Sequence, residues 1–142
     1  MKRKELKKLF VSVPVKNRTE KDIKKSVKKM KAIAEAYEGE KLDIINASDF
    51  ETVGKPSPIP GVLSEDIYYA GESMKMLAQS DVFIGVWKYT CYGFFPTCEL
   101  QRDMAERYMN PLKVHLVDLD IVAPDLGERK NVMTCDTLIK AE

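Results

Sequence analysis

The chain has 142 residues, of which 32% are charged and 44% hydrophobic, and its 23 basic side chains nearly balance 22 acidic ones. This length fits one domain, residues 1–142, and the composition is typical of a soluble globular protein rather than a disordered one. The near-zero net charge disfavours a nucleic-acid polymer as partner. No apolar run reaches the roughly 18 residues of a membrane span, and the basic start lacks the long apolar core of a signal peptide.

Cysteine and histidine usage points to a cytoplasmic protein without a metal. Cys91, Cys98 and Cys135 are odd in number and lack paired spacing, which favours a reducing compartment. With His115 as the single histidine, the sequence has no recognisable zinc pattern, so we expect neither metal nor cofactor.

The first half of the chain alternates between strand and helix patterns. The valine-rich run 9–15 predicts a buried strand, and residues 20–37 predict an amphipathic helix that Thr19 caps and Gly39 ends. The many lysines of this helix form either a solvated face or, less simply, a nucleic-acid contact. The expected core stripe is Ile23, Val27, Met30, Ala34 and Tyr37.

A second strand over 42–46 leads into a long loop, 47–60, which holds three prolines. Loops of this length are usually functional or mobile. A second helix starts after Ser64, and the run 81–87 predicts a third strand. The core stripe expected for the second helix is Ile67, Ala70, Met74, Leu77 and Ala78.

The last third of the chain predicts one more helix and one more strand. Pro96 fits the first position of a helix because proline has no amide proton to leave unsatisfied there. A fourth strand is expected over 112–119, and a weaker signal for a short strand lies at 131–134. The expected stripe of this third helix is Leu100, Met104 and Tyr108.

Alternating strands and helices predict an α/β fold, a small doubly wound (Rossmann-like) parallel sheet of four to five strands with helices on both faces. In such sheets ligands bind beyond the carboxyl ends of the strands. The segments expected at that edge are 14–18, 46–50 and 87–99.

Glu99 is the most informative residue of the edge segments. It belongs to the first turn of the helix that Pro96 opens, where the helix dipole favours a carboxylate. It is either an ordinary first-turn acid or a reagent, and its surroundings favour the second interpretation. Glu72 and Ser73 lie on the preceding helix, and aromatic rings stack flat ligands such as nucleobases, although they also cover sheet edges and subunit interfaces. The rings before Glu99 are Trp87, Tyr89, Tyr92, Phe94 and Phe95.

The run GESMKMLAQSDVFIGVWKYTCYGFFPTCELQRDMAERY, residues 71–108, resembles the signature half of the nucleoside 2-deoxyribosyltransferase-like superfamily. It looks closest to a phage- and bacterium-associated branch of unknown function. The matching features are Gly71-Glu72-Ser73, Ser80-Asp81 before a strand, and Trp87 after it. The resemblance extends more weakly over residues 8–117.

This resemblance implies that Glu99 is a nucleophile acting on the N-glycosidic bond of a nucleoside or nucleotide, by transfer or hydrolysis. Ser73 stands where the transferases carry an aspartate that helps protonate the leaving base, and Glu72 is one residue away. The approach to Glu99, through Gly93 and Phe94, is bulkier than the glycine-rich family pattern. These departures keep open the alternative of a nucleotide-binding module that has kept the pocket without the chemistry. A third alternative is an interaction protein that uses its aromatic loop as an interface.

Further substrate contacts are expected at the ends of the first three strands. Arg18 suits a 5′-phosphate through its planar fork, or is an ordinary surface arginine. His115 and Cys98 fit structural roles better than catalytic ones. We expect a homo-oligomer, because so many exposed rings would otherwise be a liability. The other expected ligand-lining residues are Ser12, Pro14, Asn46, Trp87, Tyr89 and Tyr92.

Overall fold

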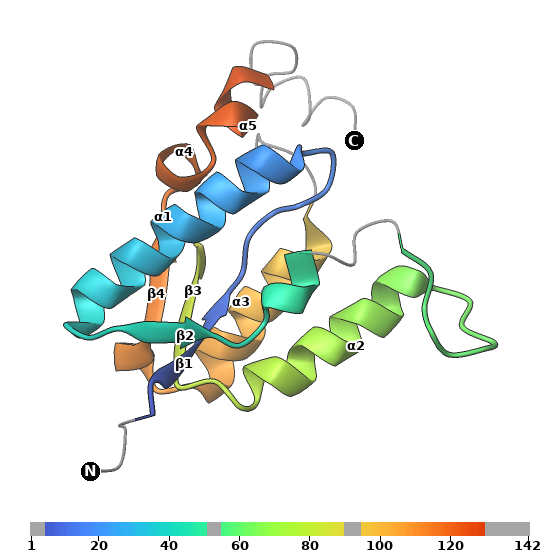
Figure 1. Ribbon diagram of the computed structural model, residues 1–142, viewed down its shortest axis with the longest axis horizontal. Coiled ribbons are helices and arrows are strands. Elements are labelled where there is room, and N and C mark those ends of the chain that lie inside the picture. The colour runs from blue at the N-terminus through green and yellow to red at the C-terminus, as the bar shows by residue number, and fades with distance from the viewer. Residues whose placement is uncertain (1–4, 51–54, 90–94, 130–142) are drawn as a thin grey trace.

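The computed structural model describes residues 5–50, 55–89 and 95–129, and Figure 1 shows the arrangement of their elements. The elements in chain order are β1 (Lys7–Val11), α1 (Glu20–Glu38), β2 (Leu42–Ile44), the 3-10 helix η1 (Ala47–Phe50), α2 (Glu65–Leu77), β3 (Val82–Val86), α3 (Pro96–Tyr108), the 3-10 helix η2 (Pro111–Lys113), β4 (Val114–Val117), α4 (Leu119–Val122) and α5 (Pro124–Arg129).

The four strands form one parallel sheet in the order β2-β1-β3-β4. Leu9 of β1 is in register with Ile44 on one side and Val82 on the other. The chain winds outward from β1 in one direction and from β3 in the other, so the sheet is doubly wound. The predicted α/β class is therefore confirmed, and the point where the winding reverses lies between β1 and β3.

Two hydrophobic layers cover the two faces of the sheet, because successive side chains of a strand point to opposite faces. Leu9 and Val11 pack into the layer that contains α1, α4 and α5. Phe10 points the other way and stacks on Phe83, with ring centroids 5.8 Å apart, beneath α2 and α3. Figure 1 shows α1 and α2 on opposite sides of the sheet.

The predicted helix ends are confirmed. Thr19 accepts a hydrogen bond from the amide of Asp22 at 3.1 Å, and Gly39 ends α1 with a φ of 71°, which glycine adopts readily. Ser64 caps α2 and Pro96 is the first residue of α3.

The predicted core stripes were wrong in part. Tyr37, Ile67 and Tyr108 are 70%, 74% and 77% exposed. In α2 and α3 the buried face includes Ser73 and Gln101, whose polar groups bond to each other. The hydrophobic pattern therefore predicted the wrong buried face for parts of these helices, because the hydrogen-bonded pair of Ser73 and Gln101 is buried instead.

All four strands are shorter than predicted. β1 ends at Val11, and the buried residues 12–14 continue beyond the sheet edge, while β4 starts only after the 3-10 turn that Pro111 opens. The expected strand at 131–134 lies outside the described residues. Within the described ranges, no helix is both long enough and apolar enough to cross a membrane.

Candidate functional site

A cleft of about 580 Å³ lies at the carboxyl end of β1, between η1, α2 and the start of α3. Its apolar walls are Val11, Val13, Phe50, Tyr69 and Phe95. Its position beside the reversal point of the sheet is where doubly wound folds bind ligands. The volume is within the range of small-molecule sites in proteins.

A chain of hydrogen bonds between neutral side chains includes Ser73 and Gln101, which line the cleft, and Ser12, which does not line it as predicted. The Ser12 hydroxyl donates to Gln101 Oε1 at 2.6 Å, and Gln101 Nε2 donates to Ser73 Oγ at 3.1 Å. The Ser73 hydroxyl donates in turn to the Ala70 carbonyl at 2.9 Å. All three polar side chains are buried, so these bonds fix α2 and α3 against the end of β1.

Asp49 brings a carboxyl group to the cleft wall from η1. Asn46 Nδ2 donates to Asp49 Oδ2 at 2.9 Å, and the same amide side chain bonds both the N–H and the C=O of Val11. Burial raises the pKa of Asp49 to about 6, although the hydrogen bond from Asn46 opposes this shift. Asn46 is thus a backbone clamp, and Asp49 is the group that reaches the cleft.

Cys98 lines the cleft and Tyr89 does not, and both are packed, buried residues. Burial raises the pKa of the Cys98 thiol to about 11, while Ser12 and Tyr89 oppose the shift by hydrogen bonding. Tyr89 is buried against Phe95 rather than exposed to a ligand. Its hydroxyl lies near Cys98 and Ser12, but among the described residues it finds no hydrogen-bond partner of adequate geometry. The structural interpretation of Cys98 is therefore favoured.

Glu99 occupies the first turn of α3, as predicted, but it does not line this cleft. The residues of the same turn that do are Pro96, Thr97 and Cys98. Glu99 shares a helix face with Arg102, one turn later, whose Nη1 donates to the Trp87 carbonyl at 2.7 Å. The expected meeting of Glu99 and Ser73 in one cleft is therefore not seen, and the nucleophilic role of Glu99 stays a prediction.

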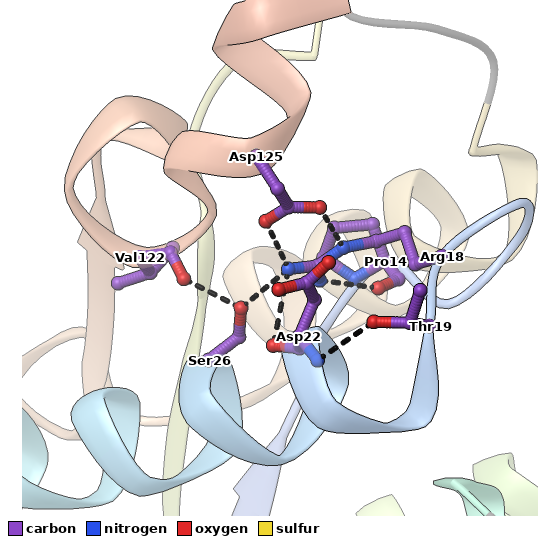
Figure 2. Close-up of polar contacts among 7 residues, drawn as sticks. All are labelled: Pro14, Arg18, Thr19, Asp22, Ser26, Val122 and Asp125. Carbon is purple, nitrogen blue, oxygen red and sulfur yellow. Dashed lines mark hydrogen bonds and ion pairs between the residues drawn. The ribbon is translucent and has the colours of Figure 1, made fainter.

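Arg18 is a structural residue, and its predicted phosphate contact is not supported. Its side chain is 0% exposed, and its guanidinium donates to both carboxylate oxygens of Asp125, at 2.9 and 2.7 Å. Figure 2 shows the same guanidinium bonded to the Pro14 carbonyl and to Ser26, whose hydroxyl donates to the Val122 carbonyl. We call this cluster of Arg18, Ser26, Val122 and Asp125 the Arg18 network.

Three further predicted site residues, Pro14, Trp87 and Glu72, do not line the cleft. Pro14 is buried and bonds Arg18 through its carbonyl. Trp87 is half-exposed, and its indole N–H donates to Asp118 at 2.5 Å. Glu72 pairs with Lys75 at 3.1 Å outside the cleft. Tyr92, Gly93 and Phe94 lie outside the described residues.

His115 lies on β4, the edge strand of the sheet, and does not line the cleft. Its Nε2 lies 2.7 Å from Glu38 Oε2, and its ring stacks on Tyr37. These contacts confirm a satisfied edge histidine. In the part of the chain that the structure describes, no group of three His, Cys, Asp or Glu side chains could hold a metal ion.

Sequence reasoning missed Asp49 and Gln101. Gln101 follows Cys98 by three residues and precedes Ala105 by four, which is a helical face of small and polar residues. That spacing could have predicted the buried face of α3, but the stripe that begins with the bulkier Leu100 was chosen instead. The sequence gave a weaker indication for Asp49, which is only that it follows soon after the end of a strand.

The chain was compared with family models, curated proteins and solved structures, and nothing in any of the three matches it. Its class therefore follows from the fold and the cleft alone: a small α/β protein with a doubly wound parallel sheet and a ligand-sized cleft at its carboxyl edge.

Proposed function

We propose that this protein binds a nucleoside or nucleotide in the cleft at the carboxyl end of β1. The observation that carries the proposal is the composition of the cleft: aromatic side chains line it together with a buried amide, a buried hydroxyl and carboxyl groups. A nucleobase has the same two properties, since its faces stack on rings and its edges form hydrogen bonds.

The cleft offers aromatic rings for stacking and polar groups for hydrogen bonds. Phe50 and Phe95 come from segments that follow two different strands, and both line the cleft. Lysines stand among the charged groups lining the same cleft, where they suit a ribose phosphate. The charged lining residues are Lys16, Asp49, Lys55, Glu65 and Asp66.

Thermal unfolding with a panel of nucleosides and nucleotides tests this proposal. One bound ligand at tenfold excess over its Kd adds about 1.4 kcal/mol to the free energy of unfolding. Ala70→Trp places a large ring in the cleft and should abolish the shift, whereas Ala36→Trp, on the exposed side of α1, should preserve it. If no compound stabilises the native protein, or if Ala70→Trp is stabilised equally, the proposal is wrong.

Cleavage or transfer at the N-glycosidic bond is a second candidate, because Glu99 lies in the helix turn whose neighbouring residues line the cleft. A carboxylate oxygen of Glu99 would attack the anomeric carbon as the C–N bond breaks. The bond's electron pair leaves with the base, which takes up a proton, and water or a second base then releases the sugar.

Base release measured by chromatography decides between binding and catalysis. The catalytic candidate predicts free base with the native protein and with Glu106→Gln, and none with Glu99→Gln. Binding without release by the native protein, or equal release by Glu99→Gln, would leave the binding function and remove the catalytic one.

We also propose that the protein is a homo-oligomer. Large apolar side chains are exposed on α2 and near β4, including Ile67, Tyr108 and Leu112. Apolar surface of this kind often marks an interface. Light scattering at tens of micromolar should give a mass above that of one chain, and a monomer would contradict the proposal.

A further inference from the structure

The side-chain amide of Gln101 is held in one orientation by hydroxyl groups at both of its ends. The Ser73 hydroxyl donates its proton to the Ala70 carbonyl at 2.9 Å, so Ser73 Oγ accepts the hydrogen bond from Gln101 Nε2 at 3.1 Å. The Ser12 hydroxyl donates to Gln101 Oε1 at 2.6 Å. These two distances fit the assignment, because O–H···O bonds are shorter than N–H···O bonds. The amide oxygen therefore faces Ser12, and the amide nitrogen faces Ser73.

One N–H of this amide meets no acceptor among the residues that the structure describes. A glutamine amide nitrogen carries two protons, and Gln101 Nε2 donates one of them, to Ser73. Gln101 is only 5% exposed, and it lines the cleft. Turning the amide over would bring its oxygen to Ser73, whose single proton already goes to Ala70. The cleft is therefore lined by a fixed donor that a ligand acceptor can satisfy.

The burial of the cleft lining favours one direction for the proposed ligand. Its buried polar residues, Ser73 and Gln101, are neutral. Each charged residue of the lining is less buried, and Lys16, Lys55 and Asp66 are exposed. A neutral base loses less hydration on burial than a sugar or a phosphate does. The base therefore fits the Gln101 end of the cleft, and the sugar fits the charged end.

We propose that Gln101 recognises the bound base through this N–H, and that the cleft selects bases with an exocyclic carbonyl oxygen over bases with an amino group in that position. The inference rests on the proposed function and names its substrate class as nucleosides of oxo bases. A carbonyl oxygen accepts the N–H, whereas an amino group brings a second donor against it. Two facing donors lose their bonds to water and form none with each other, so the amino base binds more weakly.

Calorimetric titration with two matched pairs of nucleosides tests this selection. One pair is 2′-deoxyuridine and 2′-deoxycytidine, and the other is 2′-deoxyinosine and 2′-deoxyadenosine. Within each pair an oxo group replaces an amino group on the same ring. In a pair that binds, the native protein should bind the oxo member about tenfold more tightly. Equal affinities, or tighter binding of the amino member, overturn the inference and leave the proposed function intact. If none of the four compounds binds, both are wrong.

Two variants assign the preference to the amide. Gln101→Met keeps a side chain of similar length without an N–H, and it should bind the two members of a pair with affinities within about twofold of each other. Gln79→Met is the matched control, because Gln79 is exposed after the end of α2, and it should keep the native preference. An oxo preference that survives in Gln101→Met overturns the role of Gln101.

Proton–nitrogen NMR gives a test that does not depend on the folding of Gln101→Met. The sequence has two glutamines, Gln79 and Gln101, so the side-chain amide signals of Gln101 can be assigned in Gln79→Met. When the tighter-binding oxo nucleoside is added, one amide proton of Gln101 should shift strongly, while the proton bonded to Ser73 should shift little. A ligand that binds without shifting either proton overturns the inference.

Discussion

Two buried polar clusters lie beyond the carboxyl end of β1, and they use opposite chemistry. In the Arg18 network a buried guanidinium meets a carboxylate through two hydrogen bonds, so opposite charges neutralise each other. At the cleft, the neutral side chains of Gln101 and Ser73 bond to each other and to Ser12, and Asp49 accepts a hydrogen bond from the Asn46 amide. The first cluster links α1 to α4 and α5, and the second places the carboxyl group of Asp49 in the lining of the cleft.

The difference indicates a division of roles. A buried ion pair depends on both partners, since the removal of one leaves an uncompensated charge in the interior. A neutral hydrogen-bond network loses less free energy of unfolding when one member is removed. Burial raises the pKa of Asp49, so its ionisation lowers the free energy of unfolding, a cost that proteins tolerate at functional sites.

The largest expected effect comes from breaking the Arg18 network. Asp125→Ala leaves the buried Arg18 charge without its carboxylate, and it should lower the free energy of unfolding by about 3 kcal/mol. The double variant Arg18→Met, Asp125→Leu should recover most of that loss. Urea unfolding measures both, and a single variant within 1 kcal/mol of the native protein would contradict the assigned structural role.

A smaller loss is expected from the neutral network. Gln101→Ala removes hydrogen bonds to Ser12 and Ser73 and should cost about 1–2 kcal/mol in the same measurement. A cost equal to that of Asp125→Ala would mean that the two clusters do not differ as described.

Asp49→Asn should stabilise the protein, and the effect should depend on pH. The folded-state pKa of Asp49 lies above its ordinary value, so stability is fully present below about pH 4 and is lost as pH rises through about 6. The variant should therefore be about 1–2 kcal/mol more stable than the native protein near pH 8, allowing for the water that still reaches the side chain, and equal to it near pH 4. Denaturant melts at both pH values provide the check, and a pH-independent difference would contradict the assignment.

The smallest effect on stability is expected at Glu99. It lies half-exposed outside the cleft, so Glu99→Gln should change the free energy of unfolding by less than about 0.5 kcal/mol. Calorimetry should also show unchanged nucleoside affinity. A tenfold loss of affinity would place Glu99 at the ligand and would favour the catalytic candidate.

The elements that were predicted correctly have local causes. Thr19, Gly39 and Pro96 determine helix ends through backbone chemistry within a few residues, and the valine-rich runs that became β1 and β3 can be buried only in a covered sheet. The sequence pattern therefore predicted the fold class and the edge of the sheet that carries the cleft.

The site residues were harder to predict because their roles depend on contacts between distant segments. Arg18 finds its partner 107 positions later, and Ser12 bonds Gln101 across 89 positions. Neither pairing has a local signal. The buried faces of α2 and α3 were predicted wrongly for the same reason. Ser73 and Gln101 can be buried because they form a hydrogen bond with each other, and they lie 28 positions apart in the sequence.

Amide NMR with a titrated 2′-deoxynucleoside tests the central claim most directly, because it reports on both clusters at once. We predict that resonances of Asp49, Phe50, Ser73 and Gln101 shift with a common saturation curve, while those of Arg18 and Ser26 stay in place. Shifts confined to the Arg18 network or to the lysine face of α1, or no shifts at all, would contradict the claim that the cleft is the binding site.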